Sequence, residues 1–360
     1  MTSLKERTMP RNIELAVDLL YREMRERIEL LPPGRQLPSY RSLLTTQHCS
    51  RQTLTKTLQR LERDGLIKTE KRRGMFATPD LRRRVHRILF LRVDWSCEHA
   101  EQISQALNRE FSRRRNYHYT ELRYPPEKIA LFLEELEETV ADLLILWLED
   151  VSPERIMRLF QRNIPLIFFD CGIMLPQCAI LDFQEEQIGM LAAKHLLDYG
   201  HREIALLITE PQGLTCRKRM NGFLDFLQVH QVRPHIINCG VRYGESSYGM
   251  AYDFFLRYLE RNRIDFTAGF AMSDNSALGV IKAFRESGFR VPEDVSIVGS
   301  NGIAVGERSD PPLTTIIFDT AEAARELAAG VDEIFAGGEF GIRRIPPRLV
   351  RRSTVLKLIP

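Results

Sequence analysis

The chain has 360 residues, of which 44% are hydrophobic and 28% are charged. This is an ordinary globular composition, which excludes fibrous and disordered proteins. At about 100–200 residues per domain, the length predicts two or three compact units. The longest apolar run, Leu143–Leu148, is far shorter than the ~20 residues that a membrane-spanning helix needs. We therefore expect no contact with a membrane.

The cysteines and the first residues of the chain indicate the cellular compartment of the protein. Six cysteines are scattered along the chain without a CxxC pair, which argues against a structural zinc site or a disulfide framework. The opening sequence MTSLKERTMPR lacks the apolar segment of a secretory signal peptide. No glycine-rich dinucleotide fingerprint or phosphate loop follows any predicted strand. We expect a cytoplasmic protein with neither a metal site nor a cofactor.

The charge is divided unevenly along the chain. Residues 1–87 contain 20 Lys and Arg against 10 Asp and Glu, whereas residues 88–360 contain 31 against 38. A small basic region joined to a larger acidic one favours a polyanion-binding head on a body with another role. The alternative is that the basic residues only form a solvated surface.

The first predicted helix lies near the start of the chain. Its apolar residues recur at spacings of three and four, as on one face of an amphipathic helix, at Ile13, Val17, Leu20, Met24 and Ile28. The next segment, Leu31–Pro38, contains three prolines and a glycine and therefore ends this helix.

Two shorter helices are predicted next. Ser39 stands at the N-cap of a helix over Tyr40–Thr46. Ser50 stands at the N-cap of a third helix, which Gly65 ends at its C′ position. The inner face of this third helix is formed by Leu54, Leu58 and Leu61.

A basic hairpin completes the head. Its strands, Leu66–Glu70 and Met75–Thr78, flank the turn sequence KRRG. Three helices followed by a hairpin are the order of a winged helix-turn-helix. The segment LPPGRQLPSYRSLLTTQHCSRQTLTKTLQRLERDGLIKTEKRRGMFAT resembles the DNA-binding domain of the GntR family in its LPS-x-R, SR-x-T and DGLI elements. It departs from that family at His48-Cys49 and Lys56-Thr57, where small or aliphatic residues are usual.

The third helix presents polar and basic residues to a nucleic acid. Near its N-terminal end or on its outer face it carries Ser50, Arg51, Gln52, Thr53 and Lys56. The GntR resemblance implies that Arg41 and Arg51 read bases and that Thr53 contacts the backbone or a base. It also implies that Arg73 and Gly74 take the wing into the minor groove. The expected partner is a double-stranded DNA operator, and the alternative is a set of solvated helix residues.

The sequence PDLRRRVHR, residues 79–87, marks a boundary. A cluster of arginines after a proline is typical of an exposed linker, or alternatively of a strap that contacts phosphates. We place a winged helix-turn-helix domain at 1–79, a linker at 80–87 and a larger domain at 88–360.

The larger domain alternates apolar runs with amphipathic stretches. The predicted strands are Ile88–Val93, Leu143–Leu148, Pro165–Phe169, Ile204–Ile208, Ala268–Met272 and Val295–Gly299. The predicted helices are Glu98–Phe111, Lys128–Glu138, Gln184–Tyr199 and Asn275–Ser287, with Gly222 and Gly249 as isolated helix glycines. This alternation predicts an α/β fold with doubly wound parallel sheets, and its length exceeds one sheet, so two lobes are expected.

Long motifs in the larger domain resemble LacI/GalR-type effector domains. They are DFQEEQIGMLAAKHLLDYGHREIALLI, the R-x-x-G-F element at Arg219–Phe223, and SDNSALGVIKAFRESGFRVPEDVSIVGSNGI. The resemblance implies a two-lobed periplasmic-binding-protein-like fold that binds a small effector and dimerises. A GntR head joined to such a body is similar to the arabinose-repressor architecture.

Effector-binding residues are expected where strands end, because ligands occupy the crevice at the carboxyl ends of parallel strands. Asp94 follows the first predicted strand. Trp95 and Tyr243 are candidate aromatic platforms for a sugar, although each could equally be ordinary packing.

The resemblance implies three further effector-binding residues. Arg219 would clamp an effector hydroxyl or carboxylate, and Asp274 and Asn301 would contact the effector at two acidic positions of the family motifs. Asn301 replaces the usual aspartate, and Ser300 replaces the usual aromatic residue. These changes keep hydrogen bonding but remove one charge.

The favoured hypothesis is a ligand-responsive transcriptional regulator that acts as a homodimer and represses carbohydrate-utilisation genes under the control of a sugar effector. The alternative is a solute-binding protein for a sugar without a regulatory role, which the DNA-binding head argues against. An enzyme is disfavoured because no GxSxG, HExxH or Walker motif is present.

Overall fold

The computed structural model describes residues 13–29, 31–32, 34–78, 85–94, 98–125, 128, 141–148, 164–171 and 178–358. Trp95, linker residues 80–84 and nearly all of the predicted helix Lys128–Glu138 lie outside the described residues. Packing divides the chain into two units. One comprises Met1–Leu89, Ser112–Thr120 and Ala130–Leu143, and the other comprises Phe90–Phe111, Glu121–Ile129 and Leu144–Pro360.

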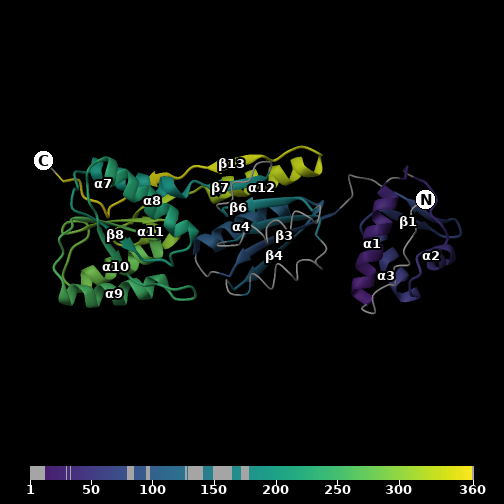
Figure 1. Ribbon diagram of the computed structural model, residues 1–360, viewed down its shortest axis with the longest axis horizontal. Coiled ribbons are helices and arrows are strands. Elements are labelled where there is room, and N and C mark those ends of the chain that lie inside the picture. Colours follow the sequence, from purple (N-terminus) through teal and green to yellow (C-terminus); the bar gives the residue numbers. More distant parts are fainter. Residues whose placement is uncertain are drawn as a thin grey trace. The chain divides into compact units, whose positions relative to one another are not determined.

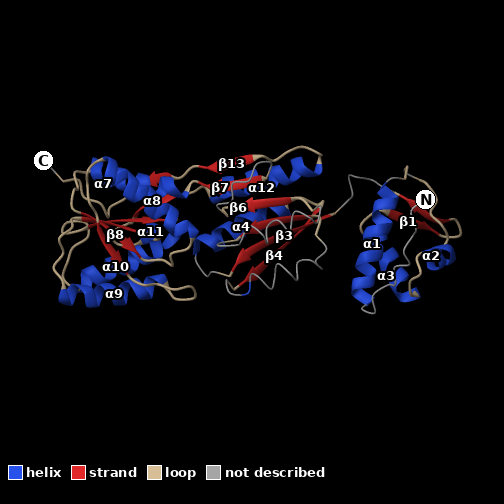
Figure 2. Ribbon diagram, viewed as in Figure 1, coloured by secondary structure: helices blue, strands red, loops and turns tan. Residues whose placement is uncertain are grey.

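The head has the three helices and the hairpin that the sequence predicts (Figures 1 and 2). Its elements are α1 (Ile13–Glu29), α2 (Tyr40–Thr46), α3 (Arg51–Arg63), β1 (Ile67–Glu70) and β2 (Gly74–Ala77), the two strands pairing antiparallel. Ser39 Oγ accepts a hydrogen bond from the Ser42 backbone N–H, and Ser50 Oγ accepts one from Thr53. Gly65 has a φ of 73°, which favours glycine and ends α3.

One apolar cluster holds the head together. It is contributed by all three helices and by the hairpin, and its buried side chains include Leu20, Met24, Ile28, Leu54 and Leu61. The leucines of α3 therefore face inward, as their spacing predicts, and the opposite face of α3 remains in solvent.

The first lobe of the body is built on a six-stranded sheet of order β13-β7-β6-β5-β3-β4. The strands are β3 (His86–Val93), β4 (Tyr117–Tyr124), β5 (Leu143–Trp147), β6 (Leu166–Phe169), β7 (Ala179–Phe183) and β13 (Ile342–Ile345). The pairs β5–β6, β6–β7 and β7–β13 are parallel. Helices α4 (Glu98–Ser112) and α12 (Thr320–Phe335) belong to this lobe (Figure 1).

The second lobe has a second six-stranded sheet, of order β14-β12-β11-β10-β8-β9. Its strands are β8 (Ile204–Ile208), β9 (His235–Asn238), β10 (Ala268–Ala271), β11 (Ser296–Ser300), β12 (Thr314–Ile317) and β14 (Arg348–Val350), of which only β14 pairs antiparallel with its neighbour. Its helices are α7 (Glu185–Asp198), α8 (Leu214–Val229), α9 (Ser247–Arg261), α10 (Asp274–Glu286) and the short α11 (Ala304–Arg308). The α/β prediction with parallel sheets is confirmed.

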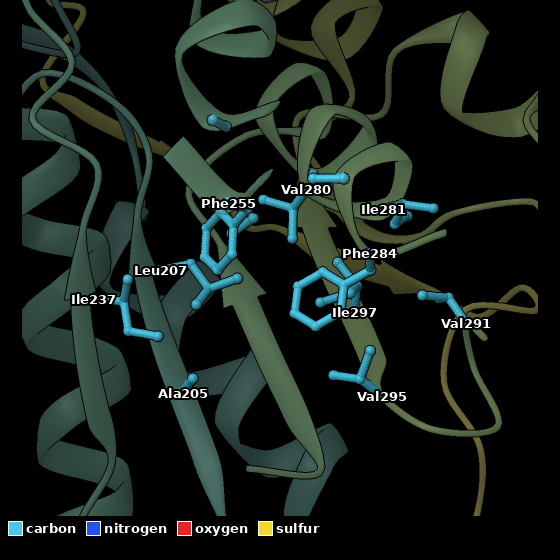
Figure 3. Close-up of a cluster of buried hydrophobic side chains, with 14 of the residues drawn as sticks. Ala205, Leu207, Ile237, Phe255, Val280, Ile281, Phe284, Val291, Val295 and Ile297 are labelled. Carbon is cyan, nitrogen blue, oxygen red and sulfur yellow. The ribbon is translucent and has the colours of Figure 1, made fainter. Parts of the chain in front are cut away.

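The core of the second lobe lies between its sheet and two helices. Leu207 and Ile297 come from the sheet, and Phe255, Val280 and Phe284 come from α9 and α10 (Figure 3). All five side chains are fully buried. This packing fixes the carboxyl ends of β8, β10 and β11, which carry residues of the cavity described below.

Helices α7 and α8 approach each other through two glycines. A Cβ atom on Gly189 would lie 1.9 Å from the Arg219 carbonyl oxygen, and one on Gly222 would lie 1.9 Å from the Glu186 carbonyl oxygen. Neither position has room for a side chain. Gly222 therefore has a packing role, whereas Gly249 in α9 meets only Ser246, at 3.6 Å.

The chain crosses between the two lobes three times. It leaves the first sheet after β7, returns with α12 and β13, and crosses again to β14. The six predicted strands are confirmed, while β4, β7, β9, β12, β13 and β14 were not expected from the sequence. In the part of the chain that the structure describes, no helix is both long and apolar enough to span a membrane.

Candidate functional site

The outer face of α3 carries exposed residues with free polar groups. Arg51, Gln52 and Lys56 are exposed, and none of their side chains has a bonding partner within the described residues. Thr53 is only 3% exposed, and its hydroxyl bonds with Ser50 Oγ at 2.8 Å. The structure thus places Thr53 inside the head, where it and Ser50 close the first turn of α3, and leaves the other three on the surface.

The hairpin turn adds further cations to the head. Arg73 pairs with Glu70 at 2.6 Å and lies over the Phe76 ring, and its carbonyl oxygen accepts a hydrogen bond from Gln36. Gly74 has a φ of 111°, a conformation that favours glycine. Lys71 and Arg72 at the tip are also exposed, and sequence reasoning did not select them. Arg41 is exposed on α2.

A cavity of about 410 Å³ is lined by residues of both lobes. The first lobe contributes side chains near the ends of its strands, including Arg92, Trp147 and Asp170. The second lobe contributes the starts of α7, α8 and α10 and the segments after β8 and β11. This is the carboxyl edge at which parallel sheets bind ligands. We refer to it as the inter-lobe cavity.

Arg219 anchors the floor of the inter-lobe cavity from α8. It is 5% exposed, and its Nε donates to Glu185 Oε2 at 2.5 Å. Its Nη1 donates to the Met272 carbonyl oxygen at 2.7 Å and to Ser300 Oγ at 2.9 Å, and its Nη2 donates to Glu185 Oε1. Burial alone would lower the pKa of Arg219, but the Glu185 carboxylate raises it above its ordinary value. Arg219 is therefore a permanent cation whose charge is already matched.

Glu210 follows β8 and lines the same cavity. Its Oε2 accepts a hydrogen bond from Ser247 at 2.6 Å, and its Oε1 accepts one from Ser273. Burial raises the pKa of Glu210, and these two hydroxyls and the Arg219 charge lower it only in part. Ser273 is the N-cap of α10, so the helix start fixes one of the two hydroxyls.

Two further polar groups at the inter-lobe cavity have buried atoms without a partner. Within the described residues, Asn301 Oδ1 and His99 Nδ1 accept or donate no hydrogen bond. Asn301 has a φ of 106°, a strained value for a residue with a side chain. Burial, with the nearby Arg219 cation, lowers the pKa of His99 to about 3, so its ring is neutral at physiological pH.

The expected effector residues separate into two groups. Arg219, Asn301 and Tyr243 line the inter-lobe cavity, whereas Asp94 and Asp274 do not. Asp94 is exposed after β3. Trp95 lies outside the described residues.

Asp274 does not line the cavity, and the framework uses both of its carboxylate oxygens. Its Oδ1 accepts a hydrogen bond from Thr315 at 2.6 Å, and its Oδ2 accepts one from the Ile303 backbone N–H at 2.9 Å. Burial raises the pKa of Asp274 to about 7, although these donors lower it in part. Its position in the structure ties α10 to the segment after β11 rather than to a ligand.

Sequence reasoning missed two carboxylates of the site. Glu210 comes two residues after the predicted strand Ile204–Ile208, so the strand-end rule applied to Asp94 would also have selected it. Glu185 opens α7, and only its pairing with Arg219 across two helices reveals its place. The described residues contain no group of three His, Cys, Asp or Glu side chains arranged to hold a metal ion.

Comparisons with known proteins agree with this geometry. Residues 17–77 match the family of bacterial regulatory proteins of the gntR type, and residues 193–355 match the periplasmic binding protein-like domain. The HTH-type transcriptional repressor PurR of Aliivibrio fischeri strain MJ11 is 32% identical over 243 residues, which cover 64% of this chain and 69% of that repressor. The chain belongs to the PurR family of transcriptional repressors. It carries the gntR-type head on the family's effector body, as both resemblances imply.

Other members of the repressor family share the body. PurR of Haemophilus influenzae strain KW20 is 29% identical over 65% of this chain and 70% of its own length. The dimeric Lac repressor with an 11-residue C-terminal deletion matches with a TM-score of 0.67 and 24% identity, over 76% of this chain and all of that chain. A LacI family regulator of Enterococcus faecium with bound ribose matches with a TM-score of 0.64 and 25% identity, over the same shares. The interpretation as a transcriptional regulator is confirmed, and the PurR and Lac relatives are repressors rather than enzymes.

Proposed function

We propose that this regulator is a repressor that binds an operator as a homodimer and is controlled by a sugar bound in the inter-lobe cavity. The observation that carries the proposal is that one chain has both an exposed basic helix surface and a separate ligand-sized cavity. A recognition helix carries the unpaired, exposed Arg51 and Lys56, and a separate cavity is lined by Trp147 and by hydrogen-bonding side chains. Ribose in the E. faecium regulator supports a sugar as the effector class.

The proposal includes the domain boundaries and the cellular location. The DNA-binding domain spans 1–79, the linker 80–87 and the effector body 88–360, and the protein acts on DNA in the cytoplasm without catalysing a reaction. Dimerisation belongs to the body, because a winged helix-turn-helix of this size offers too little surface for a lasting dimer. A solute-binding protein without a regulatory role would have no use for the basic head.

Operator binding is tested with a DNA duplex selected from a random pool by the full chain. We expect tighter binding to the selected duplex than to a scrambled one, with affinity that falls steeply as salt rises. Fluorescence anisotropy then reports whether any monosaccharide of a panel changes that affinity. Equal binding to selected and scrambled DNA would refute operator recognition.

A matched variant separates the two surfaces. Arg41→Ala combined with Arg51→Ala should abolish selection between the duplexes, yet a sugar should still raise the melting temperature of the variant, because ligand binding stabilises the folded body. If a sugar raises the melting temperature of the wild type but never alters its DNA affinity, the regulatory role of that sugar is wrong.

A further inference from the structure

The two guanidinium groups of the inter-lobe cavity are already neutralised by the protein. Arg219 is held by both oxygens of Glu185. Arg92, which is 1% exposed, donates to Glu101 at 2.7 Å and to Glu121 at 2.8 Å. An incoming anion therefore meets no lining arginine whose charge is left unmatched, and only the backbone N–H groups at the helix starts would offset its desolvation.

One carboxylate of the cavity lacks such a cation. Glu210 is partly exposed, and its oxygens accept hydrogen bonds only from Ser247 and Ser273. Among the described residues, the cation that acts on Glu210 is Arg219, whose guanidinium is already paired with Glu185. Burial raises the pKa of Glu210, but the two hydroxyls and the Arg219 charge favour its ionised form. In that form it would repel a bound phosphate or carboxylate, whereas a hydroxyl or ammonium group would complete its hydrogen bonding.

Other lining groups also call for donors. Asn301 Oδ1 is a buried acceptor without a partner in the described chain. His99 is neutral and supplies no positive charge. Asn301 Oδ1 is an acceptor, and a buried acceptor without a partner destabilises the empty cavity until a ligand supplies a donor.

We propose that the effector is a hydroxyl-rich molecule without negative charge, either a neutral sugar or an amino sugar, and that Glu210 selects it by accepting its donors and repelling phosphorylated and acidic sugars. This rests on the proposed function of the cavity as the effector site. It goes beyond that function because it names the charge class of the ligand and the residue that sets it.

The test compares matched pairs of probes on the full chain. Each pair consists of a neutral molecule and an anionic derivative: ribose and ribose phosphate, glucose and glucose phosphate, galactose and galacturonate, adenosine and adenosine monophosphate. Glucosamine is added as a cation. Melting temperature and calorimetric affinity are measured for the wild type, Glu210→Gln, Glu210→Asp and the control Glu260→Gln. The control removes one exposed carboxylate from the same lobe without touching the cavity.

We expect the wild type to bind a neutral or cationic member and to reject its anionic partner. Glu210→Gln should weaken the neutral ligand by about tenfold, as for the loss of a charge-assisted hydrogen bond, and should narrow the discrimination against the anion. Glu210→Asp keeps the negative charge, so it should still reject the anion. If Glu210→Gln does not fold, the affinity of Glu210→Asp for the two members of a pair tests the role of Glu210. Glu260→Gln should behave as the wild type.

Three results discriminate between the claims. A phosphorylated or acidic sugar that binds more tightly than its parent overturns this inference and leaves the sugar-effector proposal standing. Binding of adenosine, with the expected loss in Glu210→Gln, supports the selection of an uncharged ligand by Glu210 and overturns a sugar as the effector. Unchanged affinity and discrimination in Glu210→Gln overturn the role of Glu210.

Discussion

The head surface and the inter-lobe cavity use charged side chains in opposite ways. Arg51 and Lys56 on α3 are exposed and unpaired within the described residues, whereas Arg219 is 5% exposed and bonds with Glu185, Met272 and Ser300. Water solvates a surface charge, which stays available to an external phosphate, but a buried charge must find its partner inside the protein. The comparison teaches that a cation in a sequence motif stays available to a partner when it lies on the head surface, and is paired internally when it lies in the cavity.

The largest expected effect is that of Arg219→Ala on the stability of the body. Removing the cation leaves Glu185 buried without its partner, which should lower the free energy of unfolding by about 3–5 kcal/mol. Urea denaturation followed by tryptophan fluorescence measures it, because both tryptophans, Trp95 and Trp147, belong to the body. Arg51→Ala is the matched control on the head and should leave this transition unchanged. If Arg219→Ala lowers the free energy of unfolding no more than Arg51→Ala does, the contrast between a buried and a surface cation is wrong.

Asp274 should make stability depend on pH. Its pKa is raised by burial to about 7 from 3.8, so between these values the folded protein binds a proton that the unfolded chain releases. The free energy of unfolding therefore falls as pH rises through this window, by on the order of 4 kcal/mol. Asp274→Asn lacks the titrating group, so subtracting its curve of stability against pH isolates the effect. Parallel curves would show that Asp274 stays ionised in the fold.

The two helix glycines give a smaller, paired prediction. Gly222→Ala places a Cβ atom against the Glu186 carbonyl, which forces α7 and α8 apart and should lower the free energy of unfolding by about 1–3 kcal/mol. Gly249→Ala meets no close atom and should raise it by up to about 1 kcal/mol, because alanine favours a helix. Both are measured by the same fluorescence transition. Equal effects would mean that α7 and α8 are packed more loosely than this contact requires.

The last predicted effects are on DNA binding by the head and leave the free energy of unfolding unchanged. Arg51→Ala should weaken binding to the selected duplex by about 1–3 kcal/mol and relax the preference at one base pair, whereas Lys56→Ala should weaken all duplexes alike and reduce the salt slope by about 1. Anisotropy titrations over a range of salt measure both. Equal losses on selected and scrambled DNA for Arg51→Ala would exclude base reading by Arg51.

The sequence predicted the head more completely than the cavity. Amphipathic spacing fixes which face of α3 is buried, so the exposure of Arg51, Gln52 and Lys56 follows from it. Thr53 is the exception, because as the third residue after an N-cap it turns its hydroxyl to Ser50.

In the cavity, the motifs located the segments but not the orientation of each side chain. Ser273 lines the cavity as the extended N-cap residue of α10, whereas Asp274, the first helical residue, bonds with Thr315 and Ile303 and does not line it. The strand β13 pairs Ile342 with Ile180, far away in sequence, and no local pattern signals such a partner. The Arg219–Glu185 pair also joins separate helices, so it depends on the close approach of Gly189 and Gly222.

The three crossings between the lobes determine the order in which the parts of the chain can be completed during translation. The head is built from residues 13–78 and its core needs no later residue, so it can fold while the ribosome is still extending the chain. The first sheet lacks its edge strand until Ile345 has been added, and the second lacks β14 until Val350 has been added. A nascent chain therefore acquires its DNA-binding head long before either lobe is complete. Translation that stops between these points would release a head without a finished body to control it.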